Sequence, residues 1–340
     1  MAPDLPKTFK ALVFKEKGAP LELQDLPLSP PSAGQVLVKV VACGVCHSDA
    51  FEQQGHLWNS FPIVPGHEIV GDVVAVGDGV TRFKGGERVG GPWHGGHDGT
   101  CRACNRGNFQ MCDNAKVNGV SFNGGYAEYT TLQEEAVVRL DAKYDAAEIA
   151  PLLCAGVTVF NGLRKLHIEQ GNLVAVQGLG GLGHLAVQYS RAMGYKTVAI
   201  SRGGDKKDFA HKLGAHIYID QSKEDAVQKL QELGGAAAII STAPNGPAMK
   251  AIHYGLGVGG KFLCLAPVGP VEFDTGFLVQ KGASIQGWPS GHALDSEEAV
   301  AFADSHGIKC MVEKFPLKDG GKAFDTMLEG SVRFRSVLTM

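Results

Sequence analysis

The chain has 340 residues, of which 44% are hydrophobic and 20% are charged, and its formal net charge is −3. A chain of this length can form two domains of ordinary size, each with its own hydrophobic core. The nearly balanced charge and the absence of a basic run argue against nucleic acid as a partner.

The sequence contains no stretch of 18 or more consecutive apolar residues, so we expect no membrane-spanning segment. Residues 1–14 carry prolines and no continuous apolar run, and the first arginine is Arg82, which argues against a signal or transit peptide. These features predict a cytoplasmic protein. The eight cysteines are too few for a disulfide scaffold in a chain of this length.

Short apolar runs with frequent turns are typical of the first 150 residues. Val36–Val41 is one such run, and Ile69–Gly77 is another that ends at the turn pair Asp78-Gly79. This pattern predicts a small antiparallel barrel or sandwich.

From about Cys154 onward, strand-like apolar runs alternate with helical stretches such as His184–Met193. The strand candidates are Leu173–Gln177, Thr197–Ile200, Ile217–Ile219, Ala237–Ser241, Lys261–Leu265 and Ser284–Trp288. This alternation predicts an α/β fold in which βαβ units form a doubly wound parallel sheet that is covered on both faces. The tail from about Pro289 contains a helix-like segment, Ser296–Ser305, and a final strand-like piece.

A glycine-rich turn of the form G-x-G-x-x-G connects the first of these strands to the helix at His184. Its residues are Gly178, Leu179, Gly180, Gly181, Leu182 and Gly183. Glycines let backbone amides approach a pyrophosphate at a helix N-terminus, so a strand before the turn and a helix after it indicate a dinucleotide site. A purely structural turn is the alternative.

The second strand of this unit ends in Ser201 and Arg202, with no acidic residue at its tip. A carboxylate there would hold the adenosine ribose of NAD(H) and repel a 2′-phosphate, whereas an arginine accommodates that phosphate. The sequence therefore favours NADP(H) as the cofactor. NAD(H), with Arg202 solvated, is the alternative.

Two groups of residues have the chemistry of zinc sites. The first group, Cys46, His67 and Cys154, is dispersed along the chain, and Cys/His/Cys is one ligand set that leaves a catalytic zinc with an open position. Spacing alone does not assemble these three residues.

The second group is local, because Cys101, Cys104 and Cys112 lie in one loop rich in Gly, Asn and Arg. Such a loop suits a closed tetrahedral zinc, but a fourth cysteine is missing. Extending the spacing backwards reaches Asp98, whose carboxylate can bind zinc, and His97 is the competing candidate. The remaining alternative is a loop of free thiols. With both groups filled, the chain would hold two Zn²⁺ ions.

In this order, the motifs resemble those of zinc-dependent alcohol dehydrogenases of the medium-chain dehydrogenase/reductase superfamily, in the alcohol and cinnamyl-alcohol dehydrogenase branch. The resemblance begins near Phe9 and reaches the C-terminus; its motifs are Gly44-Val45-Cys46-His47-Ser48-Asp49, Gly66-His67-Glu68, the cysteine loop, Cys154-Ala155-Gly156-Val157-Thr158 and the glycine turn. It implies a Rossmann coenzyme domain inserted in a mostly antiparallel, barrel-like (GroES-like) catalytic domain. We place the catalytic domain at residues 1–153 and 289–340 and the Rossmann domain at residues 154–288, with the active site in the cleft.

The resemblance also implies roles for individual residues. Cys46, His67 and Cys154 would bind the catalytic zinc, with Glu68 behind the metal and Asp49 orienting His67. Ser48 would take the proton of the alcohol as hydride passes to the nicotinamide. The residues expected at the cofactor are His47 and Arg335 at the pyrophosphate and Thr158 and Leu182 at the nicotinamide.

Two positions depart from the family pattern. Asp98 replaces the first cysteine of the structural zinc loop, and Phe51 stands where many members have a histidine that ends the proton relay. Water is the candidate replacement for that histidine.

Large apolar residues are candidates for the walls of a substrate pocket. They are Phe51, Leu57, Trp58, Trp93 and Trp288. Such walls favour apolar or aromatic primary alcohols and aldehydes, although ordinary core packing is the alternative for each aromatic ring. Trp93 is the strongest candidate, because in this family the residue after Gly91-Pro92 faces the zinc.

The expected activity is the interconversion of a small alcohol, primary or alternatively secondary, with an aldehyde or ketone. Members with chains this short are often tetramers, so we expect a homotetramer or a homodimer. Two other functions stay open. One is a non-enzymatic protein that binds zinc and nucleotide, although the intact ligands and Ser48 argue against it. The other is a polyol dehydrogenase, in which glutamate often replaces Cys154.

Overall fold

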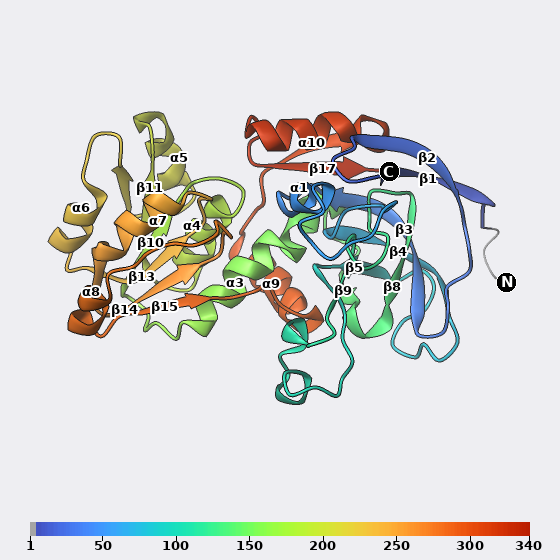
Figure 1. The fold of residues 1–340 in the computed structure, drawn as a ribbon, viewed down its shortest axis with the longest axis horizontal. Coiled ribbons are helices and arrows are strands. Elements are labelled where there is room, and N and C mark those ends of the chain that lie inside the picture. The colour runs from blue at the N-terminus through green and yellow to red at the C-terminus, as the bar shows by residue number, and fades with distance from the viewer. Residues whose placement is uncertain (1–4) are drawn as a thin grey trace. The chain divides into compact units, whose positions relative to one another are not determined.

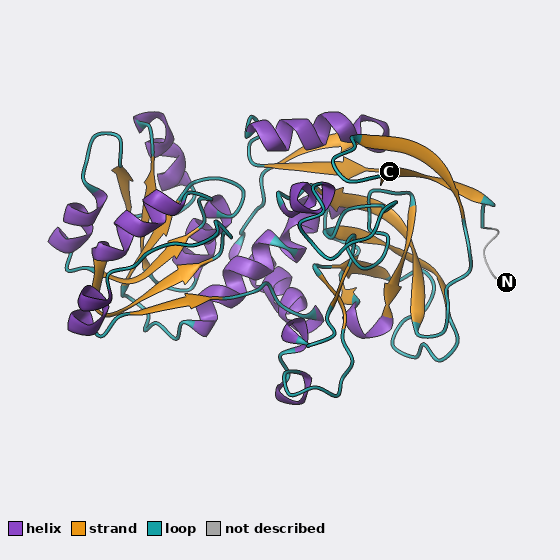
Figure 2. Cartoon of the chain, in the orientation of Figure 1, coloured by secondary structure: helices purple, strands orange, loops and turns teal. Residues whose placement is uncertain are grey.

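The computed structural model describes residues 5–340, and the chain divides into two compact units (Figures 1 and 2). The first unit runs to Val157 and also contains Ser290–Ala301 and Lys309–Met340; the second contains Thr158–Pro289 and Phe302–Ile308. The architecture confirms the expected fold class.

The unit boundaries differ from the sequence-based ones in three places, of which the smallest is Pro289, which lies in the second unit. Cys154 stays with the first unit, because the preceding 3₁₀ helix η4 (Ala150–Leu153) is buried against strands of that unit. Residues 302–308 belong to the second unit, where the ring of Phe302 packs on Tyr189 and Phe160 at centroid distances of 6.0 and 5.3 Å.

A seven-stranded sheet forms the centre of the first unit, in the order β16-β17-β3-β4-β5-β9, with β8 also paired to β3. Its strands are β3 (Gln35–Gly44), β4 (Ile69–Val76), β5 (Arg88–Gly91), β8 (Tyr129–Gln133), β9 (Val138–Arg139), β16 (Val312–Pro316) and β17 (Arg335–Thr339). Two antiparallel pairs lie beside it, β1 (Thr8–Phe14) with β2 (Leu21–Pro27) and β6 (His94–Gly96) with β7 (Lys116–Val117). Only the β16–β17 pair of the seven-stranded sheet is parallel, so this unit is mostly antiparallel, as predicted.

The register of β3 and β4 determines where the site residues lie. Val38 and Val40 of β3 and Val73 of β4 are buried in one apolar core. Cys43, near the end of β3, is paired with Ile69 at the start of β4. Because the strands are antiparallel, the residues that follow β3 and those that precede β4 emerge at the same end of the sheet.

The helices of the first unit are short, except for two near the C-terminus. They are α1 (Ser48–Gln53), α2 (Ala146–Ile149), α9 (Ala293–His306, of which residues 302–306 belong to the second unit) and α10 (Gly320–Glu329). The carboxylate of Asp145 caps α2 by accepting a hydrogen bond of 2.9 Å from the backbone N–H of Ala147.

The second unit is a doubly wound α/β fold. All six strands are parallel, in the order β12-β11-β10-β13-β14-β15, which is the order of a classical dinucleotide-binding sheet. The strands are β10 (Leu173–Gln177), β11 (Lys196–Ser201), β12 (Ile217–Asp220), β13 (Ala236–Ser241), β14 (Leu256–Cys264) and β15 (Ser284–Gly287). The helices are α3 (Ala155–Lys165, whose first three residues belong to the first unit), α4 (Gly183–Ala192), α5 (Lys207–Lys212), α6 (Ala226–Glu232), α7 (Gly246–Ile252) and α8 (Thr275–Lys281).

Each predicted strand of the second unit is present. All five residues of β10 are buried, as expected for the middle of a sheet covered by helices. Several strand ends differ from the predicted ones by one residue, and β14 begins well before the predicted Lys261, at Leu256. Glycines at positions 257, 259 and 260 interrupt the apolar pattern of β14 and hide its first half in the sequence.

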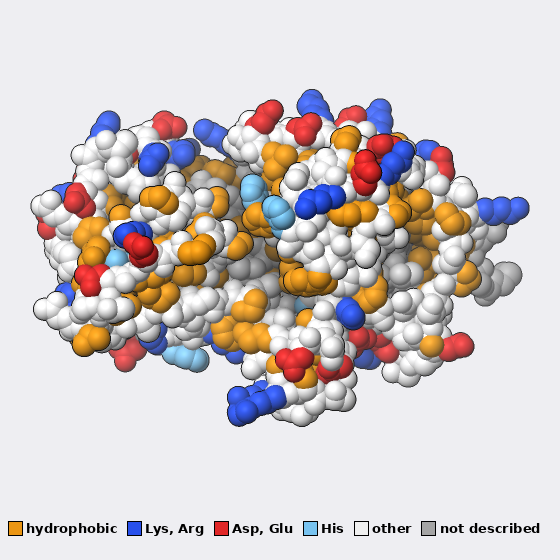
Figure 3. Space-filling model, viewed as in Figure 1, with side chains coloured by type: hydrophobic (Ala, Val, Ile, Leu, Met, Phe, Trp, Pro, Cys, Tyr) orange, Lys and Arg blue, Asp and Glu red, His pale blue; other side chains and the backbone are white. Residues whose placement is uncertain are grey.

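Within residues 5–340, no single helix is long and apolar enough to cross a membrane. One bent pair, Ala146–Leu153 with Ala155–Lys165, meets the length and composition criteria together, and most of its side chains are buried in the protein. On the face in Figure 3, acidic and basic side chains are interspersed.

Candidate active site and metal-binding groups

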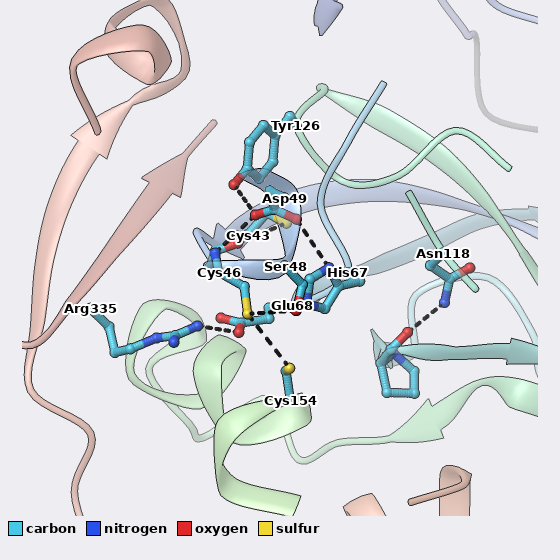
Figure 4. A network of polar contacts seen from close by, with 12 residues as sticks. Cys43, Cys46, Ser48, Asp49, His67, Glu68, Asn118, Tyr126, Cys154 and Arg335 are labelled. Carbon is cyan, nitrogen blue, oxygen red and sulfur yellow. Dashed lines mark hydrogen bonds and ion pairs between the residues drawn. The ribbon is translucent and has the colours of Figure 1, made fainter. Parts of the chain in front are cut away.

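The structure brings Cys46, His67, Glu68 and Cys154 together at one end of the first unit's sheet (Figure 4). One potential ligand atom from each residue lies within 4.8 Å of all the others. The Sγ atoms of Cys46 and Cys154 are 3.9 Å apart. A tetrahedral zinc with Zn–S bonds of about 2.3 Å separates two thiolates by about 3.8 Å, so this donor set fits the ion.

Local structure explains how these ligands meet. Cys46 lies two residues after the end of β3, His67 and Glu68 precede β4, and Cys154 lies between η4 and α3. Gly66 has a positive φ of 101°, and a Cβ there would lie 2.4 Å from the Tyr126 ring. Only glycine therefore permits the turn that delivers His67 to the group.

A buried carboxylate, Asp49, connects two of the ligands. Its Oδ2 accepts a hydrogen bond of 2.9 Å from the backbone N–H of Cys46 and one of 2.6 Å from the hydroxyl of Tyr126. Its Oδ1 lies 3.1 Å from Nδ1 of His67. A carboxylate at Nδ1 orients the imidazole so that Nε2 is directed to a metal. Sequence reasoning anticipated Asp49 but missed Tyr126, which no motif or spacing indicated.

The charges of the group suit a cation. Burial lowers the pKa of His67, but Asp49 and the thiolate of Cys46 raise it by more, so it ends well above its ordinary value. The hydrogen bond from Cys154 lowers the pKa of Cys46, and the same bond raises that of Cys154. Metal ligation requires a neutral imidazole and thiolates, so the binding of a metal ion by these residues would release protons.

Arg335 lies beside Glu68, in a buried ion pair between its guanidinium and Oε1 of that residue. Burial raises the pKa of Glu68 to about 7, although the charge of Arg335 lowers it. Gly44 leaves room for this pair, because a Cβ there would collide with Oε2 of Glu68. The sequence placed Arg335 at a cofactor pyrophosphate, whereas the observed partner of its charge is Glu68.

The structure places the pocket candidates in different surroundings. The Trp93 ring packs edge-on against the His67 ring, with centroids 4.8 Å apart. Phe51 packs against His47 at 5.7 Å, while Trp58 is 64% exposed. Leu57 is half-buried after α1, and Trp288 belongs to the second unit, where the ammonium of Lys165 lies 5.4 Å from its ring centroid. Of these candidates, Trp93 is the one that touches a metal-site residue.

Ser48 is the first residue of α1, and His47 lies between it and Cys46. The hydroxyl of Ser48 lies 3.7 Å from Sγ of Cys46 and is partly exposed, and His47 is exposed. Both residues are therefore neighbours of a candidate metal ligand, and neither side chain is fully buried.

The cysteine loop forms a second group, in which Asp98, Cys101, Cys104 and Cys112 have ligand atoms within 4.8 Å of one another. Backbone N–H groups of Cys104 and Asn114 donate to the sulfurs of Cys101 and Cys112 at 3.5 and 3.3 Å, which stabilises thiolates. Hydrogen bonds from the backbone of Thr100 and the side chain of Asn114 lower the pKa of Asp98.

His97, the competing candidate, lies outside this group. Its ring stacks on Phe109 at 4.2 Å, and its Nδ1 is 3.3 Å from Nε2 of His94. The loop therefore offers one carboxylate and three cysteine sulfurs, and this donor set is suitable for a closed tetrahedral metal site.

The glycine turn of the second unit connects β10 to α4, as expected. Gly178 has a φ of 95°, and a Cβ on Gly183 would lie 1.9 Å from the Gly178 carbonyl oxygen, so the turn requires glycine at both positions. Gly180 has open space around it, Gly181 and Leu182 are half-buried, and Thr158 is half-buried on α3. Ser201 ends β11 and is buried, and Arg202 after it is exposed.

Glu52 is a buried carboxyl that sequence reasoning did not single out. It lies one turn after Asp49 on α1, is fully buried, and neither carboxyl oxygen has a hydrogen-bond partner among residues 5–340. Burial and the charge of Asp49 raise its pKa from 4.5 to about 9. Glu52 is therefore protonated at neutral pH.

Glu52→Gln should stabilise the protein, and more at pH 8 than at pH 5. Because the pKa of Glu52 is raised on folding, its stabilising protonation is complete below pH 4.5 and is lost as the pH rises toward 9. Glutamine is neutral throughout, so the advantage of the variant should grow by up to about 1.4 kcal/mol per pH unit in that window. Thermal unfolding at both pH values measures this. The exposed control Glu16→Gln should show no such trend, and an equal trend in both variants would contradict the assignment.

Profiles of two protein families match this chain. The alcohol dehydrogenase GroES-like domain matches residues 32–142, and the zinc-binding dehydrogenase family matches residues 181–305. Alcohol dehydrogenase patD of Penicillium expansum is 58% identical over 340 residues, with all of both chains covered. Alcohol dehydrogenase notN of Aspergillus sp. (strain MF297-2) is 52% identical, with 99% of each chain covered.

Solved structures show the same fold. Acetophenone reductase from Geotrichum candidum, in complex with NAD, has a TM-score of 0.87 at 28% identity and covers 99% of this chain and 98% of that one. The protein named CAD from Helicobacter pylori, complexed with NADP(H), has a TM-score of 0.85 at 27% identity, with 99% of both chains covered. The chain therefore belongs to the zinc-type alcohol dehydrogenases of the medium-chain dehydrogenase/reductase superfamily, whose reaction is oxidoreduction between alcohols and carbonyl compounds.

Proposed function

We propose that this enzyme interconverts apolar or aromatic primary alcohols and their aldehydes, with a catalytic zinc at Cys46, His67 and Cys154 and with NADP(H) as the cofactor. The observation that carries the proposal is that ligand atoms of these three residues lie within 4.8 Å of one another, with the Asp49 carboxylate bound to the Cys46 backbone and beside His67. A zinc ion held there supplies a Lewis acid that stabilises negative charge on the substrate oxygen.

The remaining steps belong to residues of the chain. Ser48, beside Cys46 and partly exposed, takes the proton of the alcohol and passes it outward. Phe51 cannot continue this relay, so water receives the proton from Ser48. The Trp93 ring covers His67 and provides an apolar wall that excludes water and favours an apolar substrate. Secondary alcohols and ketones are the second candidate substrates.

The second group would hold a structural zinc through Asp98, Cys101, Cys104 and Cys112. Three cysteine sulfurs and one carboxylate would complete a tetrahedral set of ligands, so an ion bound there would stabilise the loop and take no part in the chemistry. The chain would then bind two zinc ions.

The proposal of NADP(H) rests on the end of β11. Ser201 and Arg202 provide a hydroxyl and a guanidinium, and the strand has no carboxylate at its tip. The similar structures in complex with NAD and with NADP(H) do not decide between the cofactors. The glycine turn would bind the pyrophosphate together with His47 and Arg335, and Thr158 and Leu182 would lie against the nicotinamide.

We also propose a cytoplasmic homo-oligomer, a tetramer or a dimer. In the second unit β15 is an edge strand, and Val258 of β14 and Val279 of α8 are 87% and 83% exposed. Exposed apolar side chains near an open strand edge favour pairing with another copy.

Metal analysis of the purified protein should find about two zinc ions per chain. Cys154→Ala should retain about one zinc and lose the reduction of benzaldehyde by NADPH, with little change in Tm, because an open catalytic site supports chemistry more than folding. Cys101→Ala should also retain about one zinc, but with a lower Tm and a modest change in rate, because a closed site contributes to folding.

Asp98→Ala and His97→Ala form a matched pair for the fourth ligand of the loop. The first variant should lose the loop zinc, and the second should keep both ions.

Near-normal turnover of Cys154→Ala would refute the catalytic ligand set. A single zinc in the wild type, with Cys101→Ala fully stable, would refute the loop site.

Arg202→Ala should raise the KM for NADPH by at least about tenfold and leave that for NADH nearly unchanged. A charge-assisted pair with the 2′-phosphate contributes roughly 1.5–3 kcal/mol, which is about ten- to a hundredfold in affinity. Ser201→Asp should shift the preference toward NADH, since it adds an acceptor for the ribose and repels the phosphate. Equal losses for both cofactors would mean that Arg202 only supports the turn. Wild-type preference for NADH would refute NADP(H).

A further inference from the structure

The turn that follows β11 is held by the neighbouring strand β12. The two strands are parallel and in register, so that Ser201 lies opposite Asp220. The carbonyl oxygen of Ser201 accepts a hydrogen bond of 3.0 Å from the backbone N–H of Gln221. Only Arg202 and Gly203 separate the end of β11 from the 3₁₀ helix η5 (Gly204–Lys206). The fixed end of β11 therefore lies immediately before Arg202.

Two side chains of β12 form hydrogen bonds with the two polar groups of the Gly203 backbone, its N–H and its carbonyl oxygen. The N–H of Gly203 donates to Oδ1 of Asp220 at 3.0 Å, and its carbonyl accepts from the hydroxyl of Tyr218 at 2.6 Å. Gly203 has a φ of 93°, so the turn uses a conformation that favours glycine. The bond to its N–H fixes the Arg202–Gly203 peptide, and with it the direction in which the Arg202 side chain leaves the turn.

Asp220 and Tyr218 are both in the protonation state that their hydrogen bonds to Gly203 require, ionised for Asp220 and neutral for Tyr218. Oδ1 of Asp220 also accepts bonds of 2.6 and 3.0 Å from the hydroxyl and the backbone N–H of Ser222, and these bonds lower the pKa of Asp220. Burial and the charge of Asp220 raise the pKa of Tyr218. Asp220 is therefore an ionised acceptor, and Tyr218 a protonated donor, across the neutral pH range.

Arg202 itself is left unpaired by these contacts. Its side chain is exposed, and within residues 5–340 its guanidinium makes no hydrogen bond or ion pair. The structure thus fixes the backbone on either side of Arg202 and leaves its charge available to a ligand. Fixing the turn before binding reduces the conformational entropy that binding must overcome.

A carboxylate beside Ser201 also suggests an opposite role, as an acceptor for the ribose hydroxyls of NAD(H). The geometry argues against it. Oδ1 of Asp220 already accepts three hydrogen bonds, and Oδ2 is buried beneath the turn, 3.7 Å from where a Cβ on Gly204 would lie. The carboxylate faces the turn and not solvent.

We propose that Tyr218 and Asp220 are positioning residues for cofactor selection, which clamp Gly203 so that Arg202 is presented to the 2′-phosphate of NADP(H). This inference rests on the proposed use of NADP(H). The inference assigns a role in cofactor selection to two residues of β12, a strand that does not contribute to the glycine turn. Neither residue would touch the phosphate.

Tyr218→Phe tests the clamp by removing one hydroxyl. Loss of the hydrogen bond to Gly203, together with the contact between the Tyr218 hydroxyl and the Ser201 side chain, should weaken NADPH binding about three- to tenfold and NADH binding less, with the kcat at saturating NADPH unchanged. Titration calorimetry with each cofactor measures the two Kd values. Tyr254→Phe is the matched control, because Tyr254 is a tyrosine of the same unit whose hydroxyl donates to Asp274 at 3.1 Å. It should bind both cofactors as the wild type does.

Two substitutions of Asp220 separate positioning from charge. Asp220→Asn keeps an oxygen that can accept from Gly203 and removes the charge, whereas Asp220→Ala removes both. The clamp predicts that the asparagine variant retains most of the wild-type selectivity for NADPH and that the alanine variant loses at least about fivefold of it. The ratio of the two Kd values is the decisive readout, because general destabilisation would weaken both cofactors alike.

The possible failures can be told apart. If Arg202→Ala weakens NADPH binding but Tyr218→Phe and Asp220→Ala do not change the selectivity, the clamp is refuted and the use of NADP(H) stands. If both Asp220 variants lose NADH binding instead, Asp220 binds the ribose and the inference is overturned. If the wild type prefers NADH, the proposed use of NADP(H) is refuted, and the positioning role of Tyr218 and Asp220 is refuted with it.

Discussion

The buried carboxylate of Asp49 is the contact on which the catalytic centre depends. It accepts hydrogen bonds from the Cys46 backbone and the Tyr126 hydroxyl and contacts Nδ1 of His67, so it joins segments that are distant in sequence. The β3–β4 register brings Cys46 and His67 to one end of the sheet, and the Asp49 carboxylate beside Nδ1 orients the histidine. Its negative charge also favours a cation among ligands that are otherwise buried.

The same principle recurs in the second unit, where a strand register brings a buried carboxylate to a functional turn. Asp220 lies opposite Ser201 and binds the backbone of Gly203, much as Asp49 binds the backbone of Cys46. In both places the proposed role of the acidic residue is to order a neighbouring group that would contact the ligand, without contacting the ligand itself. Acidic side chains thus position a metal ligand in one unit and a candidate phosphate-binding arginine in the other.

The sequence predicted what is local and what a family motif specifies. The glycine turn was anticipated at the right residues because it lies between an apolar strand and an amphipathic helix, and Asp98 was preferred to His97 from spacing within one loop. Contacts between distant residues were not predictable. Arg335 and Glu68 are 267 positions apart, and Tyr126 and Asp49 are 77 apart, so no spacing rule connects them. Likewise, β12 was predicted as a strand, but only its register shows that Asp220 ends beside Ser201.

The most direct test of this account is the zinc affinity of Asp49→Asn, which preserves the shape of the side chain and removes its charge. Competition with a chromophoric chelator should show the catalytic zinc bound about ten- to a hundredfold more weakly than in the wild type. The loop zinc should be held as before, which provides an internal reference. If both ions dissociate as they do from the wild type, the Asp49 carboxylate does not organise the catalytic site, and the central claim is wrong.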